Sequence, residues 1–305
     1  MRLRMTPARF RTKTRTKGLR SSDAAVAAFR TLVLSYYRKH GRHSLPWRKT
    51  RDPYRILVSE VMLQQTQVDR ALPYYRVFLK QFPTVSALAA APLAEVLRAW
   101  QGLGYNRRAK HLWEAARVVV DERGGKFPKT IEALERLPGV GPYTARAVAA
   151  FAYGIDSVFV ETNIRTAVIH HFFPKQGIRN TTIYGSVSDS EIVTILEKAT
   201  PKGKAREWNW ALMDYGAYLK RSGVRLNARS KGYVKQKQFK GSMREARGAV
   251  LRRLAEGPAT RAALAKLLGS NRTVQMRLAL DSLRREKLIE CTNRLYLLYS
   301  ARPYT

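Results

Sequence analysis

Helical periodicity runs through almost the whole segment from Ser22 to Ser222, and no stretch inside it alternates convincingly between apolar and polar residues. Apolar residues recur at intervals of three and four, which is the spacing of one face of an α-helix. Residues that cap helices precede these runs, and Gly or Pro follows them. The pattern predicts one all-α domain of many short helices.

Helix starts are marked clearly in this segment. Asp52 followed by Pro53 predicts a helix start, because aspartate caps the first amides and proline suits the first helical position. That helix runs to Leu63. Further helices are predicted near residues 67–81, 92–101, 106–122, 130–136, 144–153, 163–172, 189–199 and 204–220.

Beyond this block, a basic linker is predicted at residues 223–242. It belongs to a stretch from 220 to 240 with eight Lys or Arg residues and no acidic residue. Such a stretch is either a solvated linker or a strap along a nucleic-acid backbone. The candidate backbone contacts are Lys231, Lys235 and Lys237.

Residues 243–305 predict a second, smaller domain. Three helices (244–255, 261–268 and 273–287) precede two short strands about an Asn293-Arg294 turn. This is the layout of a winged helix-turn-helix domain, or of a protein-binding domain of the same shape.

The charge balance indicates a polyanionic partner. The 305 residues contain 57 Lys or Arg against 22 Asp or Glu, a net charge of +35. Self-repulsion on that scale is normally tolerated where nucleic acid cancels it. A membrane role is not favoured, because the sequence has no run of about 18 apolar residues. Nucleic acid is the expected partner.

Compartment signals are few. Residues 1–20 carry eight Lys or Arg and no acid, which is typical of a disordered phosphate-binding arm or of an organelle transit peptide. Cys291 is the single cysteine, so an internal disulfide is excluded and a reducing, intracellular compartment is expected. The bacterial cytoplasm or nucleoid is favoured, with an organelle or the nucleus as alternatives.

The segment Leu137-Pro-Gly-Val-Gly-Pro-Tyr143 lies between two predicted helices. Gly139 and Gly141 let the backbone approach a phosphate, and the amides at the start of the next helix, near Thr144, face an anion. The segment is therefore a candidate DNA-backbone contact, with a plain tight turn as the alternative.

This segment resembles the hairpin of the helix-hairpin-helix (HhH-GPD) DNA glycosylase superfamily. Four other motifs resemble the A/G-mismatch adenine DNA glycosylases (MutY type), in register from about residue 25 to 220. They are Leu45-Pro46-Trp47-Arg48, Ser-Glu-Val-Met-Leu-Gln-Gln-Thr-Gln-Val at 59–68, Gly102-Leu103-Gly104-Tyr105 and Leu212-Met213-Asp214-Tyr215-Gly216. The resemblance implies a two-lobed all-α glycosylase core over residues 21–222. It also implies a monomeric base excision repair enzyme acting on double-stranded DNA that holds a mispaired or damaged base.

Cleaving a glycosidic bond requires an acid at the leaving base and a carboxylate beside the sugar. The base must first be extruded from the duplex into a pocket. Glu60 lies among Val58, Val61 and Met62 in a predicted helix, so burial is expected to raise the pKa of its carboxyl toward neutrality. In the resembling family, the glutamate at this position protonates the adenine leaving group.

The second carboxylate departs from the family pattern. Where the family has Asp before a Gly-Asn pair, this chain has Glu161-Thr162-Asn163. Glu161 is longer by one C–C bond, about 1.5 Å, and catalytic geometry is sensitive on that scale. We expect Glu161, with Asn163 beside it, to stabilise or trap the sugar cation; altered chemistry is the alternative.

Tyr143 stands where bifunctional relatives have a lysine that forms a Schiff base with the sugar. A phenol has no amine for that step. The resemblance therefore predicts a monofunctional glycosylase that leaves an abasic site, with substitution by another lysine as the alternative.

The resemblance also assigns contacts to DNA and to the base. Gln65 and Tyr105 resemble the residues that wedge into the duplex near the opposite base, because glutamine reads base edges and tyrosine stacks on them. Leu45, Trp47 and Arg48 resemble the walls of the adenine pocket. Leu63, Gln64 and Thr66 border the wedge.

Two parts of the family pattern do not occur in this sequence. The stretch Tyr218 to Val224 lacks the cysteines that hold a [4Fe–4S] cluster in such relatives, so no cluster is expected. A monovalent cation on the hairpin carbonyls of residues 137–143 would be typical of the family. The C-terminal domain that recognises 8-oxoguanine is replaced by the predicted winged helix.

The net charge, the hairpin, the two carboxylates and the wedge residues together favour adenine opposite G or 8-oxoguanine as the substrate. The first alternative is another target on the same scaffold, such as uracil, thymine in a G·T pair, or hypoxanthine. The second alternative is a DNA-binding protein without catalysis.

Overall fold

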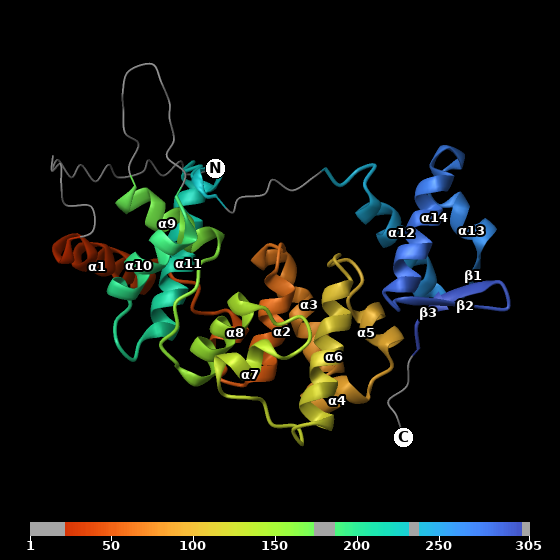
Figure 1. The fold of residues 1–305 in the computed structure, drawn as a ribbon, viewed down its shortest axis with the longest axis horizontal. Helices are drawn as coiled ribbons and strands as arrows, with labels where there is room; N and C mark the ends of the chain where they lie inside the picture. Colours follow the sequence, from red (N-terminus) through yellow and green to blue (C-terminus); the bar gives the residue numbers. More distant parts are fainter. Residues whose placement is uncertain (1–21, 174–186, 232–237, 301–305) are drawn as a thin grey trace, which may run out of the picture.

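The computed structural model describes residues 22–173, 187–231 and 238–300 (Figure 1). The expected basic arm, 1–20, and the candidate contacts Lys235 and Lys237 lie outside these residues. The described part is an all-α core followed by a small C-terminal domain, as the sequence predicts.

One lobe of the core is built from the middle of the chain. Asp52 accepts hydrogen bonds from the amides of Tyr54 (2.8 Å) and Arg55 (3.4 Å), so the predicted cap is confirmed. A π-helical turn, Ala149–Tyr153, continues the last helix of this lobe. The helices are α2 (Pro53–Leu63), α3 (Val68–Gln81), α4 (Val85–Ala90), α5 (Leu93–Ala99), α6 (Arg107–Asp121), α7 (Ile131–Glu135) and α8 (Pro142–Val148).

The sequence analysis missed α4. It has six residues, and the Thr84 side chain starts it by accepting from the Ala87 amide at 3.1 Å.

The other lobe joins the first helix of the chain to three later ones: α1 (Asp23–His40), α9 (Thr162–Phe172), α10 (Asp189–Ala199) and α11 (Ala205–Arg221). Figure 1 shows these four helices grouped on one side of the molecule, with α2 to α8 beside them. The two lobes are thus made of interleaved stretches of chain, so residues near 60, 143 and 161 meet only in the folded protein.

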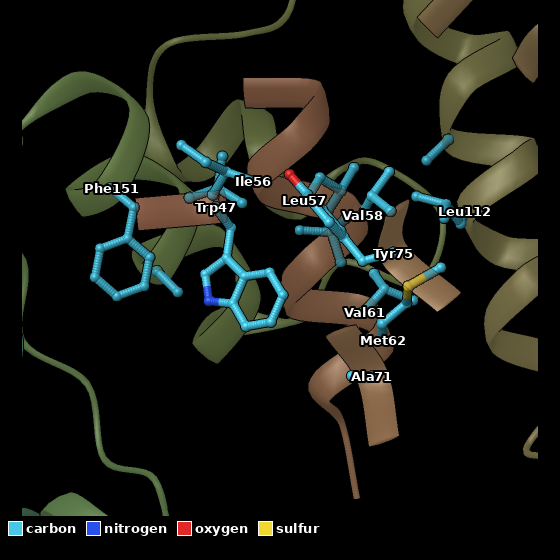
Figure 2. Packing of buried hydrophobic residues seen from close by; sticks show 14 of the residues in the cluster. Trp47, Ile56, Leu57, Val58, Val61, Met62, Ala71, Tyr75, Leu112 and Phe151 are labelled. Carbon is cyan, nitrogen blue, oxygen red and sulfur yellow. The ribbon is translucent and has the colours of Figure 1, made fainter. Parts of the chain in front are cut away.

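The core of the first lobe forms around α2. Ile56, Leu57, Val58 and Met62 are all at most 2 % exposed. Figure 2 shows them packed with side chains from neighbouring elements, Trp47 and Phe151 among them. Because α2 is buried on nearly every side, a polar residue within it is also removed from water.

The first part of the predicted linker packs onto the core. Asn227 Oδ1 accepts from Thr166 Oγ1 of α9 at 2.9 Å. A parallel bridge joins Ser230 to Val187, and Ser230 is 5 % exposed. Lys231, by contrast, is exposed on the surface next to this bridge.

The C-terminal domain has the predicted order of helices and strands. Two antiparallel strands meet at Asn293 and Arg294, whose φ angles of 51° and 63° form the predicted turn. A short strand that the sequence analysis missed, β1, completes a sheet of order β1-β3-β2. The elements are α12 (Met243–Glu256), β1 (Ala259–Thr260), α13 (Arg261–Lys266), α14 (Thr273–Arg285), β2 (Ile289–Thr292) and β3 (Leu295–Leu298).

Among the described residues, no helix combines the length and the apolar character needed to cross a membrane.

Candidate active site

Glu60 lies in the middle of α2 and is 5 % exposed. Burial raises the pKa of its carboxyl to about 7, and the nearby charge of Glu161 acts in the same direction. The predicted burial and its effect on the pKa are thus confirmed. A carboxyl with this pKa can give up a proton near neutral pH.

Tyr143 is the partner of Glu60. Its hydroxyl donates a hydrogen bond of 3.0 Å to Glu60 Oε2 from the first turn of α8. Burial, followed by the two carboxylates, raises the pKa of the Tyr143 phenol well above its ordinary value, so it remains a donor. The sequence analysis treated Tyr143 only as the residue that stands in place of a lysine, and it did not predict this contact.

Glu161 caps α9. Its Oε1 accepts from the amides of Asn163 and Ile164, both at 2.7 Å, and its Oε2 accepts from Asn163 Nδ2 at 3.2 Å. The start of a helix favours negative charge at this place. Glu161 also acts electrostatically on both Glu60 and Tyr143, so the two predicted carboxylates lie within range of each other's charge.

A close helix crossing fixes the position of this cap. A Cβ on Gly216 of α11 would lie 2.0 Å from the backbone oxygen of Asn163. Only glycine therefore permits α11 to approach the start of α9 this closely. This gives the glycine of the motif at residues 212–216 a physical role, which is to set the place of Glu161.

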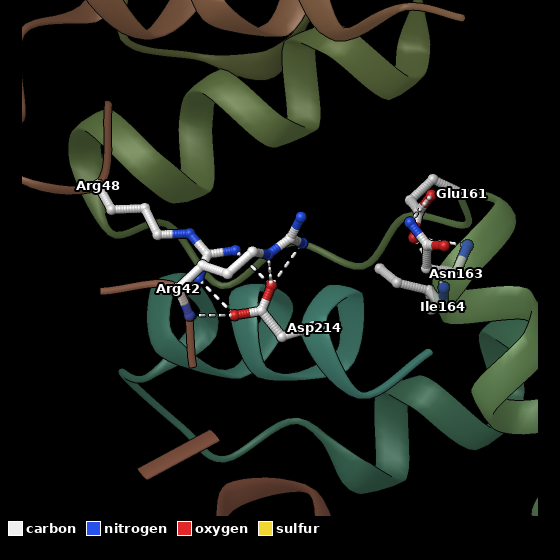
Figure 3. A network of polar contacts seen from close by, with 6 residues as sticks. All are labelled: Arg42, Arg48, Glu161, Asn163, Ile164 and Asp214. Atoms are coloured by element: carbon white, nitrogen blue, oxygen red, sulfur yellow. Dashed lines mark hydrogen bonds and ion pairs between the residues drawn. The ribbon is translucent and has the colours of Figure 1, made fainter. Parts of the chain in front are cut away.

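Arg48 is held by Asp214, the acid of the same motif. Its guanidinium donates to both carboxylate oxygens of Asp214, at 2.6 and 2.9 Å, and Arg42 donates to the same group through its amide at 2.8 Å (Figure 3). Burial opposes ionisation of Asp214, but the hydrogen bonds and charges of the two arginines outweigh it and lower its pKa. The charge of Arg48 also acts on Glu60.

The other two predicted pocket walls are packed in the core. Leu45 and Trp47 are 7 % and 5 % exposed, and the Trp47 ring meets Tyr75 edge to face at 5.2 Å. Figure 2 shows the Trp47 ring among core side chains. Their contact with a base stays a prediction.

The predicted hairpin joins α7 to α8. Gly139 has a φ of 73°, and a Cβ there would lie 2.4 Å from the Cβ of His111, so both the backbone and the packing require glycine. Gly141 is exposed, and a Cβ on it would meet nothing within 4 Å. Thr144 is buried, and its hydroxyl accepts from Gln64 Nε2 at 3.4 Å. Gly139 and Gly141 are both exposed on this hairpin, and their contact with DNA stays a prediction.

The predicted wedge residues lie in two short loops, 63–66 and 102–105, called here the wedge loops. Gln65 and Tyr105 have φ angles of 56° and 49°, which residues other than glycine rarely adopt. Such strain costs about 1–3 kcal/mol per residue and tends to occur at functional sites. Leu63 and Thr66 are half-buried beside them.

Arg108 joins the two wedge loops and was not predicted. Its Nη1 donates to the carbonyls of Met62 (2.9 Å) and Gln64 (2.6 Å), and its Nη2 donates to Gly104 O at 3.1 Å. Burial lowers the pKa of this guanidinium to about 10, so it still carries its charge at neutral pH. No local sequence signal separates Arg108 from the other cations of the chain.

A [4Fe–4S] cluster does not fit this chain. Such a cluster needs four thiolates, whereas Cys291 is the single cysteine and lies in β2 of the C-terminal domain.

The helical hairpin and the buried acid beside a second carboxylate define a base-excising DNA glycosylase. Residues 58–194 match the model of the HhH-GPD superfamily of base excision DNA repair proteins. The chain is 38 % identical to the adenine DNA glycosylase of Mycolicibacterium smegmatis over 278 residues, 85 % of this chain and 92 % of that protein. It is 32 % identical to the one from Buchnera aphidicola subsp. Baizongia pistaciae over 69 % of this chain and 60 % of that protein. The chain belongs to the family of adenine DNA glycosylases.

Solved structures agree with the fold. A thermostable thymine-DNA glycosylase is 31 % identical, with a TM-score of 0.55 over 65 % of this chain and 88 % of that chain. An endonuclease III in a trapped covalent DNA complex shares the fold at 20 % identity and a TM-score of 0.52, covering 65 % of this chain and 87 % of that one.

Proposed function

We propose that this protein excises adenine mispaired with G or 8-oxoguanine from double-stranded DNA and leaves an abasic site. The observation that carries the proposal is the Glu60 carboxyl, 5 % exposed and with a pKa of about 7, hydrogen-bonded by Tyr143 and coupled to Glu161. An acid and a carboxylate converging on one place are what hydrolysis of a glycosidic bond requires.

In the proposed reaction, protonated Glu60 gives its proton to a ring nitrogen of the extruded adenine. The bond between the sugar C1′ and the base then breaks, and its electron pair leaves with the base. Glu161 faces the resulting sugar cation, held in place by the amides at the start of α9. Water adds to C1′, and its proton passes to the Glu60 carboxylate, which restores the protonated acid.

The proposed reaction ends at the abasic site. Strand cleavage by a bifunctional enzyme starts from an amine that attacks the sugar, and Tyr143 offers a phenol instead. Lys220 is the lysine whose charge interacts with Glu161, and burial lowers the pKa of its amine. Borohydride trapping of wild type and K220R tests this step: no adduct is expected, and an adduct lost in K220R would identify a lyase.

Thymine in a G·T pair is a second candidate target, because the thermostable thymine-DNA glycosylase structure is 31 % identical to this chain. The deciding experiment uses labelled duplexes that hold A, T, U or hypoxanthine opposite G, 8-oxoguanine, C or T. Each is incubated with excess protein and then cleaved with alkali. We expect the fastest cleavage with A opposite G or 8-oxoguanine, and none in E60Q. Faster release of thymine or uracil would replace adenine as the substrate.

A further inference from the structure

A cavity of about 470 Å³ lies between the wedge loops and α12 of the C-terminal domain. The core contributes Gln65 and Tyr105 to its lining, and α12 contributes Arg244 and Arg247. Its volume falls within the range of small-molecule sites, about 300–1,000 Å³. The cavity adjoins the active site through Gln64, which also lines it and reaches Thr144 on α8.

Ion pairs hold the C-terminal domain at this place. Glu286, which follows α14, forms an ion pair with Arg107 Nη2 of α6 at 2.9 Å and accepts a hydrogen bond from Arg247 Nη2 at 2.6 Å. Arg98 of α5 also donates to the Ala255 carbonyl at the end of α12 at 3.2 Å. The face of α12 that borders the cavity is therefore fixed against the core by contacts on more than one helix.

Arg244 is placed differently from the other arginines around the cavity. Arg107 and Arg247 pair with Glu286, and Arg108 turns to the carbonyls beneath the wedge loops. Arg244 instead donates to the hydroxyl of Tyr105 at 2.5 Å, with its guanidinium 5.4 Å from the centre of that ring. The C-terminal domain thus reaches the wedge residue itself.

We infer that this cavity holds the base facing the extruded nucleotide, and that Arg244 determines which base is accepted there. The inference rests on the proposed function. A guanidinium matches the O6 and N7 acceptors of guanine as a two-pronged donor, whereas cytosine and thymine lack that pair of acceptors. The chemical class of the ligand is therefore a guanine-type purine in the strand opposite the target.

The composition of the cavity favours a base over a backbone phosphate. Positive charge is enough to bind a backbone phosphate. In this cavity, however, the aromatic ring of Tyr105 and the side-chain amide of Gln65 line the same space as the arginines. These groups stack on a base and bond to its edge. A phosphate contact at Arg244 would strengthen binding equally for every opposite base, so the two cases differ in what they predict.

The test measures binding by fluorescence anisotropy to duplexes that carry a stable abasic analogue opposite G, 8-oxoguanine, C or T. Wild type is expected to prefer G over C by roughly fivefold to a hundredfold. R244Q is expected to lose this preference, and R244K to lose most of it, because lysine keeps the charge but not the planar fork. R252Q is the matched control, since Arg252 is exposed on the same helix and does not line the cavity.

Three results would overturn the inference: no preference in wild type, an unchanged preference in R244Q, or equal weakening with all four duplexes. Thermal melting of each variant checks that it is folded. Adenine excision by wild type is measured in parallel. Absence of excision would refute the proposed function while the binding preference still reports on Arg244, and excision with an unchanged preference in R244Q would refute this inference alone.

Discussion

The hydroxyl of Tyr143 donates a 3.0 Å hydrogen bond to the carboxylate of Glu60, linking α8 to α2 inside the active site. Burial raises the pKa of Glu60, and this bond partly opposes the rise because it favours the ionised form. The pair therefore sets the pH range in which Glu60 is a proton donor.

Replacing Tyr143 by Phe should extend activity to higher pH. The variant loses the bond that lowers the pKa of Glu60, so the pKa rises above about 7. A hydrogen bond contributes about 0.5–1.5 kcal/mol net, which corresponds to about one pH unit at most. Single-turnover excision measured between pH 5 and pH 9 gives the midpoint. An unchanged midpoint in Y143F would show that the phenol does not tune the acid.

Replacing Glu60 by Gln should abolish excision and yet stabilise the protein in alkaline buffer. The folded-state pKa of about 7 exceeds the ordinary value of 4.5, so folding loses stability as pH rises between these values. Glutamine avoids the buried charge, and the gain at pH 8 is expected to approach about 3 kcal/mol. Urea unfolding at pH 4 and pH 8 measures it. Equal stability of the two proteins at pH 8 would contradict a buried, ionised Glu60.

Replacing Gly216 by Ala should both destabilise the protein and slow excision. The added Cβ would lie 2.0 Å from Asn163 O, so α9 must move and carry Glu161 with it. Overpacking of this kind costs about 1–3 kcal/mol. G248A is the control for stability, because a Cβ on Gly248 meets nothing within 4 Å and should add about 0.5–1 kcal/mol. Full excision activity in G216A would separate this crossing from the placement of Glu161.

Replacing Arg108 by Lys should loosen the wedge loops. Lysine keeps the charge but cannot reach the carbonyls of Met62, Gln64 and Gly104 together. We expect a loss of about 2–4 kcal/mol in the free energy of unfolding, since buried carbonyls are left without donors. Excision should slow more on a paired duplex than on one whose target adenine faces an abasic site and is already unpaired. The same slowing on both substrates would argue against a role in extrusion.

Neutralising the basic segment should flatten the salt dependence of DNA binding. The variant replaces Lys231, Lys235 and Lys237 by Gln. Each phosphate contact that is lost makes the negative slope of log K against log salt shallower by about 0.9. Exposed lysines elsewhere provide a charge-matched control, Lys80, Lys126 and Lys129 to Gln. If both triple variants show the same slope, the segment acts through net charge and not as a strap.

The sequence predicted the helices that carry the site, because capping residues and apolar spacing are local signals. The cap at Asp52, the burial of Glu60 and the turn at Asn293 and Arg294 follow from such neighbours. Two regular elements, α4 and β1, escaped prediction, and β1 has only two residues, too few to show a period.

By itself, the sequence determined a helical DNA glycosylase with a buried acid and a glycine hairpin. The tertiary structure decided the partners of the polar groups. Asp214 meets Arg48 across 166 positions, and Arg244 meets Tyr105 across 139. Gly216 gains its importance from a contact with Asn163 on another helix. A charge or a glycine has no local signal for such a partner, because 57 residues carry the same positive charge and only the packing of the helices selects among them.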